Sequence, residues 1–225
     1  MPEQEQAKEQ NKNKISELIQ NAKSIAILPS KVAGADAFCA AAALYHMLKV
    51  REKQVFIIYP GKLPDGTENL LKPEQITQEV KTRKLVVSID YAGTQASKVH
   101  YSTDKEVLNL MLAPISKDFD PRTKVKAEVV GFEFDLILTL GAQSPYDFGN
   151  IFEDVKEDMQ KATIINIDNT NLNSRFGGIN YIDPLAQSIS LMVFSTSNVW
   201  GLTPDLVAAK ALLGGIVSKE PKGSA

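Results

Sequence analysis

Short apolar runs of strand length recur along the chain, and most are followed by segments in which apolar residues repeat with helical spacing. Such runs, rich in β-branched residues, are typical of strands that are covered on both faces of a sheet. Because parallel strands need long crossovers, this alternation predicts an α/β fold with a mainly parallel, doubly wound sheet and flanking helices. The predicted core strands are residues 24–28, 54–59, 84–90, 135–140 and 163–167, with a further short run at 179–182.

Helices are predicted between these runs. Ile15, Leu18, Ile19 and Ala22 form a helical stripe, so a first helix should reach about Ala22. The other predicted helices are 36–50, beginning near Asp36, one from Ser144 or Pro145 to about Lys161, 188–199, and 204–218 after a Thr203 cap and Pro204.

The segment from about 99 to 130 has a different pattern. Residues 99–102 and 106–112 read as two β arms around Thr103-Asp104-Lys105, which predicts a hairpin, and 124–130 adds a further strand. We expect this segment to be an antiparallel β insertion. The predicted organisation is a flexible or frayed N-terminal tail at 1–14, one domain at 15–219 and a C-terminal tail at 220–225.

Composition narrows the possible partners. The chain of 225 residues has 25 basic and 27 acidic side chains, so no overall field favours nucleic acid or an anionic membrane. No apolar stretch approaches the roughly 20 residues of a membrane span. The single cysteine, Cys39, excludes an internal disulfide framework, and without an evident signal peptide we expect a cytoplasmic protein.

The candidate site follows the run at 163–167, where Asp168-Asn169-Thr170-Asn171 interrupts the apolar pattern. Open α/β sheets bind ligands at the carboxyl ends of their strands. We therefore expect Asp168 to lie at or beside any site.

Several short motifs occur in a characteristic order along the chain. Asp168, Asn173, Phe176-Gly177 and Asp183-Pro184 follow one another after the run at 163–167, and a later alanine- and leucine-rich stretch ends in Gly215-Ile216-Val217. Together with Asp36 and the DLILTLGAQ stretch, they resemble the N-terminal domain of the DHH-superfamily phosphoesterases, which include RecJ-like nucleases and oligoribonuclease/pAp phosphatases. The resemblance spans roughly residues 15–219 and does not include that family's smaller C-terminal substrate-binding domain.

The resemblance implies two divalent ions, usually manganese, held by aspartates and histidines. This chain departs from that pattern at most ligand positions. Of the first motif only Asp36 remains, because its histidine position is Leu28 or Ser30 and its first aspartate position is Gly34. The other replacements are Gly141 for an aspartate, Asn169 and Thr170 for the paired histidines, and Lys219 for a late aspartate.

Two-metal hydrolysis needs two closely spaced ions with several anionic or imidazole ligands. Asp36 and Asp168 supply two carboxylates, so the leading hypothesis is a catalytically degenerate domain, a pseudoenzyme that acts in binding or assembly without a resident cofactor. One alternative is an active phosphoesterase on nucleotides or short oligonucleotides, with manganese or magnesium on Asp36 and Asp168. Another is a metal-independent module that binds nucleotide or phosphate through Ser30, Lys31, Asn169 and Thr170.

Each candidate also has a purely structural interpretation. Asp36 could cap its own helix, and Asp168, Asn169, Thr170 and Asn173 could organise a turn. Cys39, beside an alanine run, is expected to be a buried small residue. A homodimer or another protein partner could use the last helix or the antiparallel insertion, whereas no membrane partner is expected.

Overall fold

The computed structural model describes residues 2–78, 84–94, 98–130 and 134–219, which divide into two compact units. Residues 1–81 and 132–225 form the first unit, and residues 82–131 form the second. The expected tail at 220–225 lies outside the described residues.

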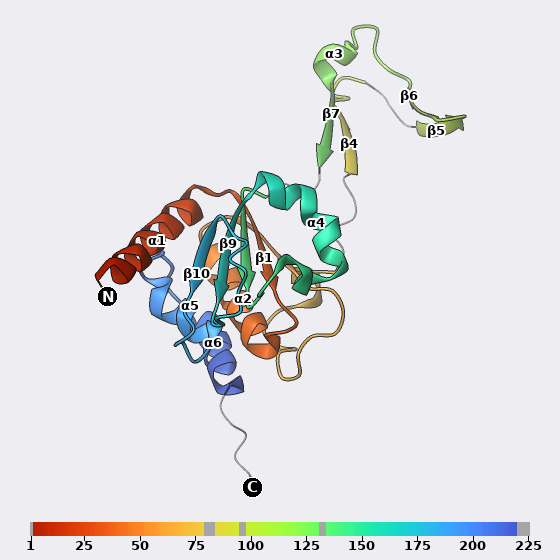
Figure 1. Ribbon diagram of the computed structural model, residues 1–225. Helices are drawn as coiled ribbons and strands as arrows, with labels where there is room; N and C mark the ends of the chain where they lie inside the picture. The colour runs from red at the N-terminus through yellow and green to blue at the C-terminus, as the bar shows by residue number, and fades with distance from the viewer. Residues whose placement is uncertain (1, 79–83, 95–97, 131–133, 220–225) are drawn as a thin grey trace. The chain divides into compact units, whose positions relative to one another are not determined.

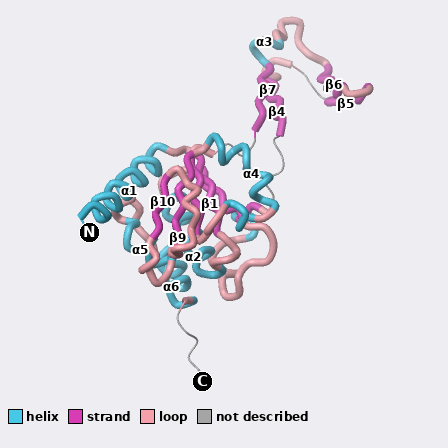
Figure 2. The backbone as a smooth tube through the Cα atoms, in the orientation of Figure 1, coloured by secondary structure: helices cyan, strands magenta, loops and turns pink. Residues whose placement is uncertain are grey.

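The first unit is built on a six-stranded sheet with the order β10-β9-β8-β1-β2-β3. All of its strand pairs are parallel, which confirms the predicted sheet. Figures 1 and 2 show the strands of this sheet among its flanking helices. The two-residue strand β3 was not predicted. The strands are β1 (Ser24–Pro29), β2 (Gln54–Ile58), β3 (Ile76–Thr77), β8 (Leu136–Leu140), β9 (Thr163–Asp168) and β10 (Ile179–Ile182).

Helices cover both faces of this sheet. Apolar side chains of α1, α2, α5 and α6 form one core with one face, and α4 contributes to a second core on the other. This arrangement is the predicted doubly wound one. The helical segments of this unit are α1 (Pro2–Asn21), α2 (Gly34–Lys49), α4 (Asn150–Lys161), α5 (Ile189–Ser197), α6 (Leu206–Ser218) and the 3₁₀ turns η1 (Pro73–Gln75) and η2 (Pro145–Phe148).

Small residues let α2, α5 and α6 approach closely. Ala40 to Ala43 on α2 are fully buried, and Gly215 on α6 faces Ser190 and Cys39. A Cβ atom at position 215 would lie 1.9 Å from Ser190 Oγ and 2.9 Å from Cys39 Cβ. Only glycine therefore fits at this crossing, and Cys39 is a buried packing residue as expected.

Several predicted helix boundaries were wrong. The N-cap of α2 is Ala33, so Asp36 lies inside the first turn, and α6 begins after Asp205, whose side chain accepts from Ala208 N, rather than after Thr203. Gly149, with φ +57, separates η2 from α4 within the segment predicted as one helix. Residues 2–14, for which a frayed helix or a tail was predicted, belong to helix α1, and the predicted fraying stays a prediction.

The second unit contains two antiparallel strand pairs. Strand β4 (Lys84–Ile89) pairs with β7 (Val125–Val130), strand β5 (Lys98–Asp104) pairs with β6 (Val107–Ala113), and a short helix α3 (Pro121–Lys124) precedes β7. The predicted antiparallel insertion and its hairpin are confirmed.

The insertion begins earlier than expected, because the prediction of a core strand at 84–90 was wrong. Strand β4 pairs antiparallel with β7 in a separate two-stranded sheet, and Leu85 in β4 is 67% exposed. A core strand of a parallel α/β sheet would instead be covered on both faces. Among the described residues, no helix is long and apolar enough to cross a membrane.

Candidate functional site

The strand order places a topological switch point between β1 and β8. From β1 the chain moves outward to β2 and β3, and it then returns to β8 and moves the other way to β9 and β10. Ser30 N donates to Leu140 O at 2.8 Å, and Gly141 N donates to Ile167 O at 2.9 Å. Ser30, Gly141 and Asp168 therefore follow one another along the edge where ligands bind in sheets of this kind.

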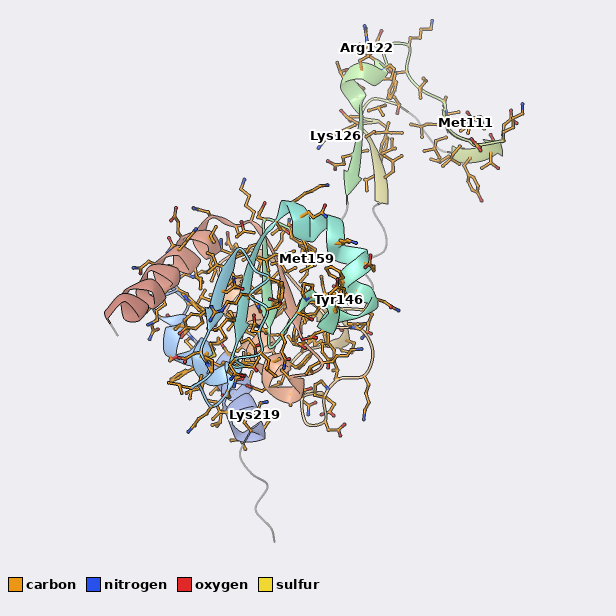
Figure 3. The ribbon with its side chains drawn as sticks, viewed as in Figure 1. Met111, Arg122, Lys126, Tyr146, Met159 and Lys219 are labelled. Carbon is orange, nitrogen blue, oxygen red and sulfur yellow. The ribbon has the colours of Figure 1, made fainter. Side chains whose placement is uncertain are left out.

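Asp168 ends β9 and is 3% exposed. Its Oδ1 accepts from Asn169 N and its Oδ2 accepts from Asn173 Nδ2, both at 2.8 Å. The pKa of the Asp168 carboxyl is raised, mainly because the group is buried. The hydrogen bonds from Asn173 and Asn169 lower this pKa in part. The negative charge of Asp147 raises it, and the positive charge of Lys219 lowers it. Lys219 follows α6, where Figure 3 labels it.

A buried chain of polar side chains supports Asp168 from within the sheet. Asn173 Nδ2 also donates to Ala142 O at 2.8 Å, and its Oδ1 accepts from Asn166 Nδ2 at 2.9 Å. Asn166 Oδ1 in turn accepts from Thr139 Oγ1 at 3.0 Å, across the β8–β9 pair. Sequence analysis missed Thr139 and Asn166, although a polar residue inside each of two apolar runs was a usable signal.

Asp36 is fully buried and binds the first residues of α5. Its Oδ2 accepts from Ile189 N at 2.8 Å, its Oδ1 accepts from Ser190 N at 2.9 Å, and Ser190 Oγ donates to the Asp36 carbonyl at 3.1 Å. The prediction that Asp36 caps its own helix was therefore wrong, since it binds the N-terminus of another helix, where a negative charge is favoured. Asp36 and Asp168 have no hydrogen-bond partner in common among the described residues.

Gly141 lies at the end of β8 with φ +67. A Cβ atom at this position would lie 2.4 Å from Ala33 Cβ and 2.7 Å from Ile189 Cδ1. The space into which a side chain at position 141 would extend is thus filled by apolar groups from the start of α2 and from α5. An aspartate in this backbone position would need these elements to move apart.

The remaining candidates have structural partners of their own. Ser30 is fully buried, and its Oγ accepts from Val32 N at 3.1 Å. Asn169 Nδ2 donates to Ala186 O at 3.1 Å, and Thr170 Oγ1 accepts from Leu172 N at 3.2 Å. Such side-chain bonds to nearby backbone are typical of residues that shape a turn.

Asp147 is a second acidic residue near Asp168 that sequence analysis missed. It lies in η2 and accepts from Gln143 N at 2.7 Å and from Ser144 N at 3.4 Å. In the part of the chain that the structure describes, no group of three or more histidine, cysteine, aspartate or glutamate side chains could hold a metal ion.

The described structure places His46, His100 and Cys39 in settings that do not suggest a catalytic role. A ring nitrogen of His46 lies 3.1 Å from Leu70 O, and His100 lies on the exposed strand β5. Burial, with a smaller contribution from the charge of Asp36, raises the pKa of the Cys39 thiol to about 11. Cys39 is thus a neutral thiol at physiological pH.

Comparison with known proteins shows a likeness in fold. The sequence matches no protein-family description and no curated protein. Among solved structures, the fold is similar to that of an exopolyphosphatase-related protein from Bacteroides fragilis, with a TM-score of 0.64 and 17% identity. The alignment covers 93% of this chain and 49% of that one, so the chain spans about half the length of its structural relative. At this identity the likeness establishes the α/β fold.

Proposed function

We propose that this chain is a phosphoesterase-like domain of the DHH type that no longer holds two catalytic metals and acts through binding or assembly. The observation that carries the proposal is the use of Asp36. Both of its carboxylate oxygens accept backbone N–H groups of Ile189 and Ser190 inside the protein. Because Asp36 is also fully buried, a metal ion could reach this carboxylate only if the residues packed around it moved.

Two neighbouring positions support the same conclusion. Gly141 stands at a family aspartate position, and Ala33 and Ile189 fill the space beside it. Lys219 stands at another family aspartate position. Its positive charge lowers the pKa of the Asp168 carboxyl, as a bound cation would. A positive charge that acts on Asp168 would also repel a dication bound there.

The remaining ligands are too few for two-metal chemistry. Two dications a few ångströms apart need several carboxylates or imidazoles to offset their mutual repulsion. Asp168 has both oxygens in hydrogen bonds to Asn169 and Asn173, and Asp147 accepts from backbone amides. A single hydrated magnesium or manganese on Asp168 is the alternative that retains activity.

Hydrolysis assays separate these possibilities. The purified chain is incubated with Mn²⁺ or Mg²⁺ and with pAp, short oligonucleotides or inorganic polyphosphate, beside the Asp168→Asn variant. We expect no metal-dependent turnover in either protein. Turnover by the parent that is lost in Asp168→Asn would overturn the proposal. Asp36 variants are less informative here, because they also disturb α5.

Within the proposal, assembly is favoured over nucleotide binding. Ser30 Oγ and Thr170 Oγ1 accept backbone N–H groups and Asn169 Nδ2 donates to Ala186 O, so each of these side chains already helps to hold its own turn. A thermal-shift series with AMP, pAp and inorganic phosphate tests this preference, because a ligand that binds the folded chain raises its melting temperature with concentration. We expect no such dependence.

A further inference from the structure

The hairpin of the second unit exposes an apolar face. Pairing in register puts Val99 opposite Leu112 and Tyr101 opposite Leu110, and alternation along each strand places Leu108 on the same face. Val99 is 71% exposed, Tyr101 77%, Leu108 59% and Leu110 54%. We call these five residues the hairpin face. Met111, labelled in Figure 3, belongs to the opposite face of the same hairpin.

The hairpin is poorly covered by the rest of its unit. Leu110, Leu112 and Val99 line an apolar cavity of about 400 Å³ together with Val87 and Ile89 of β4. Among the described residues, β5 and β6 pair with each other and with no third strand. A two-stranded ribbon is only marginally stable by itself in water, and further strands or a packed face stabilise it.

The two edges of the hairpin differ in chemistry. Strand β5 carries Lys98, His100 and Asp104, whereas β6, from Val107 to Ala113, has no ionisable side chain. Charged residues on an edge strand discourage pairing with another chain, and an exposed, uncharged apolar edge permits it. The free edge of β6 is therefore the edge suited to accept another strand.

We propose that β6 pairs antiparallel with β6 of a second copy of this chain, about a twofold axis at Leu110. The sequence of β6 is self-complementary in this register. Leu108 lies opposite Leu112 of the partner subunit and Val107 lies opposite Ala113 of the partner subunit, while Leu110 meets Leu110 of the partner subunit. The leucines remain on one face, and the product is a four-stranded antiparallel sheet with an isologous interface.

The alternative edge makes a poorer match. The same operation on β5, about Tyr101, would place Val99 opposite Thr103 of the partner subunit and would bring Lys98 and Asp104 into the seam. Pairing through β6 joins apolar side chains throughout, apart from Asn109, and desolvates no charge. This proposal specifies the assembly role, and it does not depend on the loss of the metal site.

Sedimentation of the full chain, with charge substitutions at the axis, tests the proposal. The parent should show a mass that rises with concentration from 24.7 kDa towards twice that value. Leu110→Lys and Leu110→Glu each place like charges opposite one another, so each should weaken dimerisation at least 10-fold. An equimolar mixture of the two should dimerise again, because opposite charges then meet. Recovery on mixing excludes misfolding as the cause of the single-variant loss.

Ser102→Lys is the matched control, since it adds the same charge to β5 on the face opposite to the hairpin face. It should leave the parental association unchanged. A Leu110→Cys variant should also form a disulfide-linked dimer on mild oxidation, while Cys39 is buried and Ser102→Cys should not cross-link. A parent that stays monomeric at all concentrations, single variants that associate as the parent does, or a mixture that fails to recover would each overturn the proposal.

Discussion

The carboxylate of Asp36 accepts the backbone N–H of Ile189 at 2.8 Å across 153 residues of sequence. This bond and its companion to Ser190 join the first turn of α2 to the first turn of α5. Asp36 thus links two helices that lie far apart in the sequence.

Removal of the Asp36 carboxylate should destabilise the fold strongly. Asp36→Ala leaves two buried N–H groups without acceptors, so we expect a loss of about 3 kcal/mol in the free energy of unfolding. Asp205→Ala, which removes an exposed N-cap from α6, is the matched control and should cost about 1 kcal/mol. Urea unfolding measures both. A free metal-binding carboxylate would instead give an Asp36→Ala variant as stable as the parent, or more stable.

The packing at Gly141 should make even a methyl group costly. Gly141→Ala combines a left-handed backbone with contacts below 3 Å to Ala33 and Ile189, so we expect a loss of about 3 kcal/mol. Gly34→Ala is the control, because Gly34 has φ +64 and nothing within 4 Å of an added Cβ. It should lose about 1 kcal/mol from the backbone alone. Equal losses in the two variants would mean that position 141 has room for a side chain.

The crossing of α6 with α2 and α5 can be tested with two adjacent glycines. Gly215→Ala would place its Cβ against Ser190 and Cys39, and should destabilise the chain by roughly 3 kcal/mol. At Gly214, on the exposed side, the nearest atom is Cys39 Sγ at 3.7 Å, so alanine fits. Gly214→Ala should be neutral, or stabilising by up to about 1 kcal/mol, because alanine has the higher helix propensity. Equal melting temperatures for Gly215→Ala and Gly214→Ala would contradict this packing.

The pKa of Asp168 offers a test by titration. Burial raises the pKa of Asp168, while hydrogen bonds from Ser24 N and Lys23 N lower that of Asp135. In a carboxyl-carbon NMR titration, Asp168 should therefore titrate at a higher pH than Asp135. The opposite order would show that the environment of Asp168 favours its charged form, as a metal site does.

The two aspartates should affect stability with opposite signs. Ionised Asp168 disfavours folding at neutral pH, and this penalty is relieved as the pH falls through its raised folded pKa. The contribution of Asp135 is present above its unfolded pKa and is lost as the pH falls through its lowered folded pKa. The stability difference between the parent and Asp135→Asn should accordingly shrink on acidification. A difference that is constant with pH would contradict the role given to the Ser24 and Lys23 bonds.

The sequence predicted the parallel sheet and the placement of Asp168 at a strand end, because both depend on local patterns. The apolar runs around β1, β8 and β9 mark covered strands, and a polar turn marks where the last of them ends. The run at 84–90 was misassigned, because a short apolar stretch has no feature that separates a core strand from one of an exposed antiparallel pair.

The partners of Asp36 and the space around Gly141 could not be predicted in the same way. Asp36 bonds to residues 153 and 154 positions away, and the local preference for aspartate at helix starts pointed to its own helix instead. Gly141 is surrounded by Ala33 and Ile189, which only the packing of α2 and α5 brings together. The sequence could identify these positions as departures from a family pattern, but their present contacts depend on the folded structure.

Calorimetric titration of the purified chain with MnCl₂, followed by a hydrolysis assay on the same sample, tests whether the chain holds two catalytic metal ions. We expect no saturable heat of binding and no turnover of pAp, oligonucleotide or polyphosphate above the rate in buffer with manganese alone. Saturable binding of two manganese ions per chain, with hydrolysis that disappears in Asp168→Asn, would contradict it.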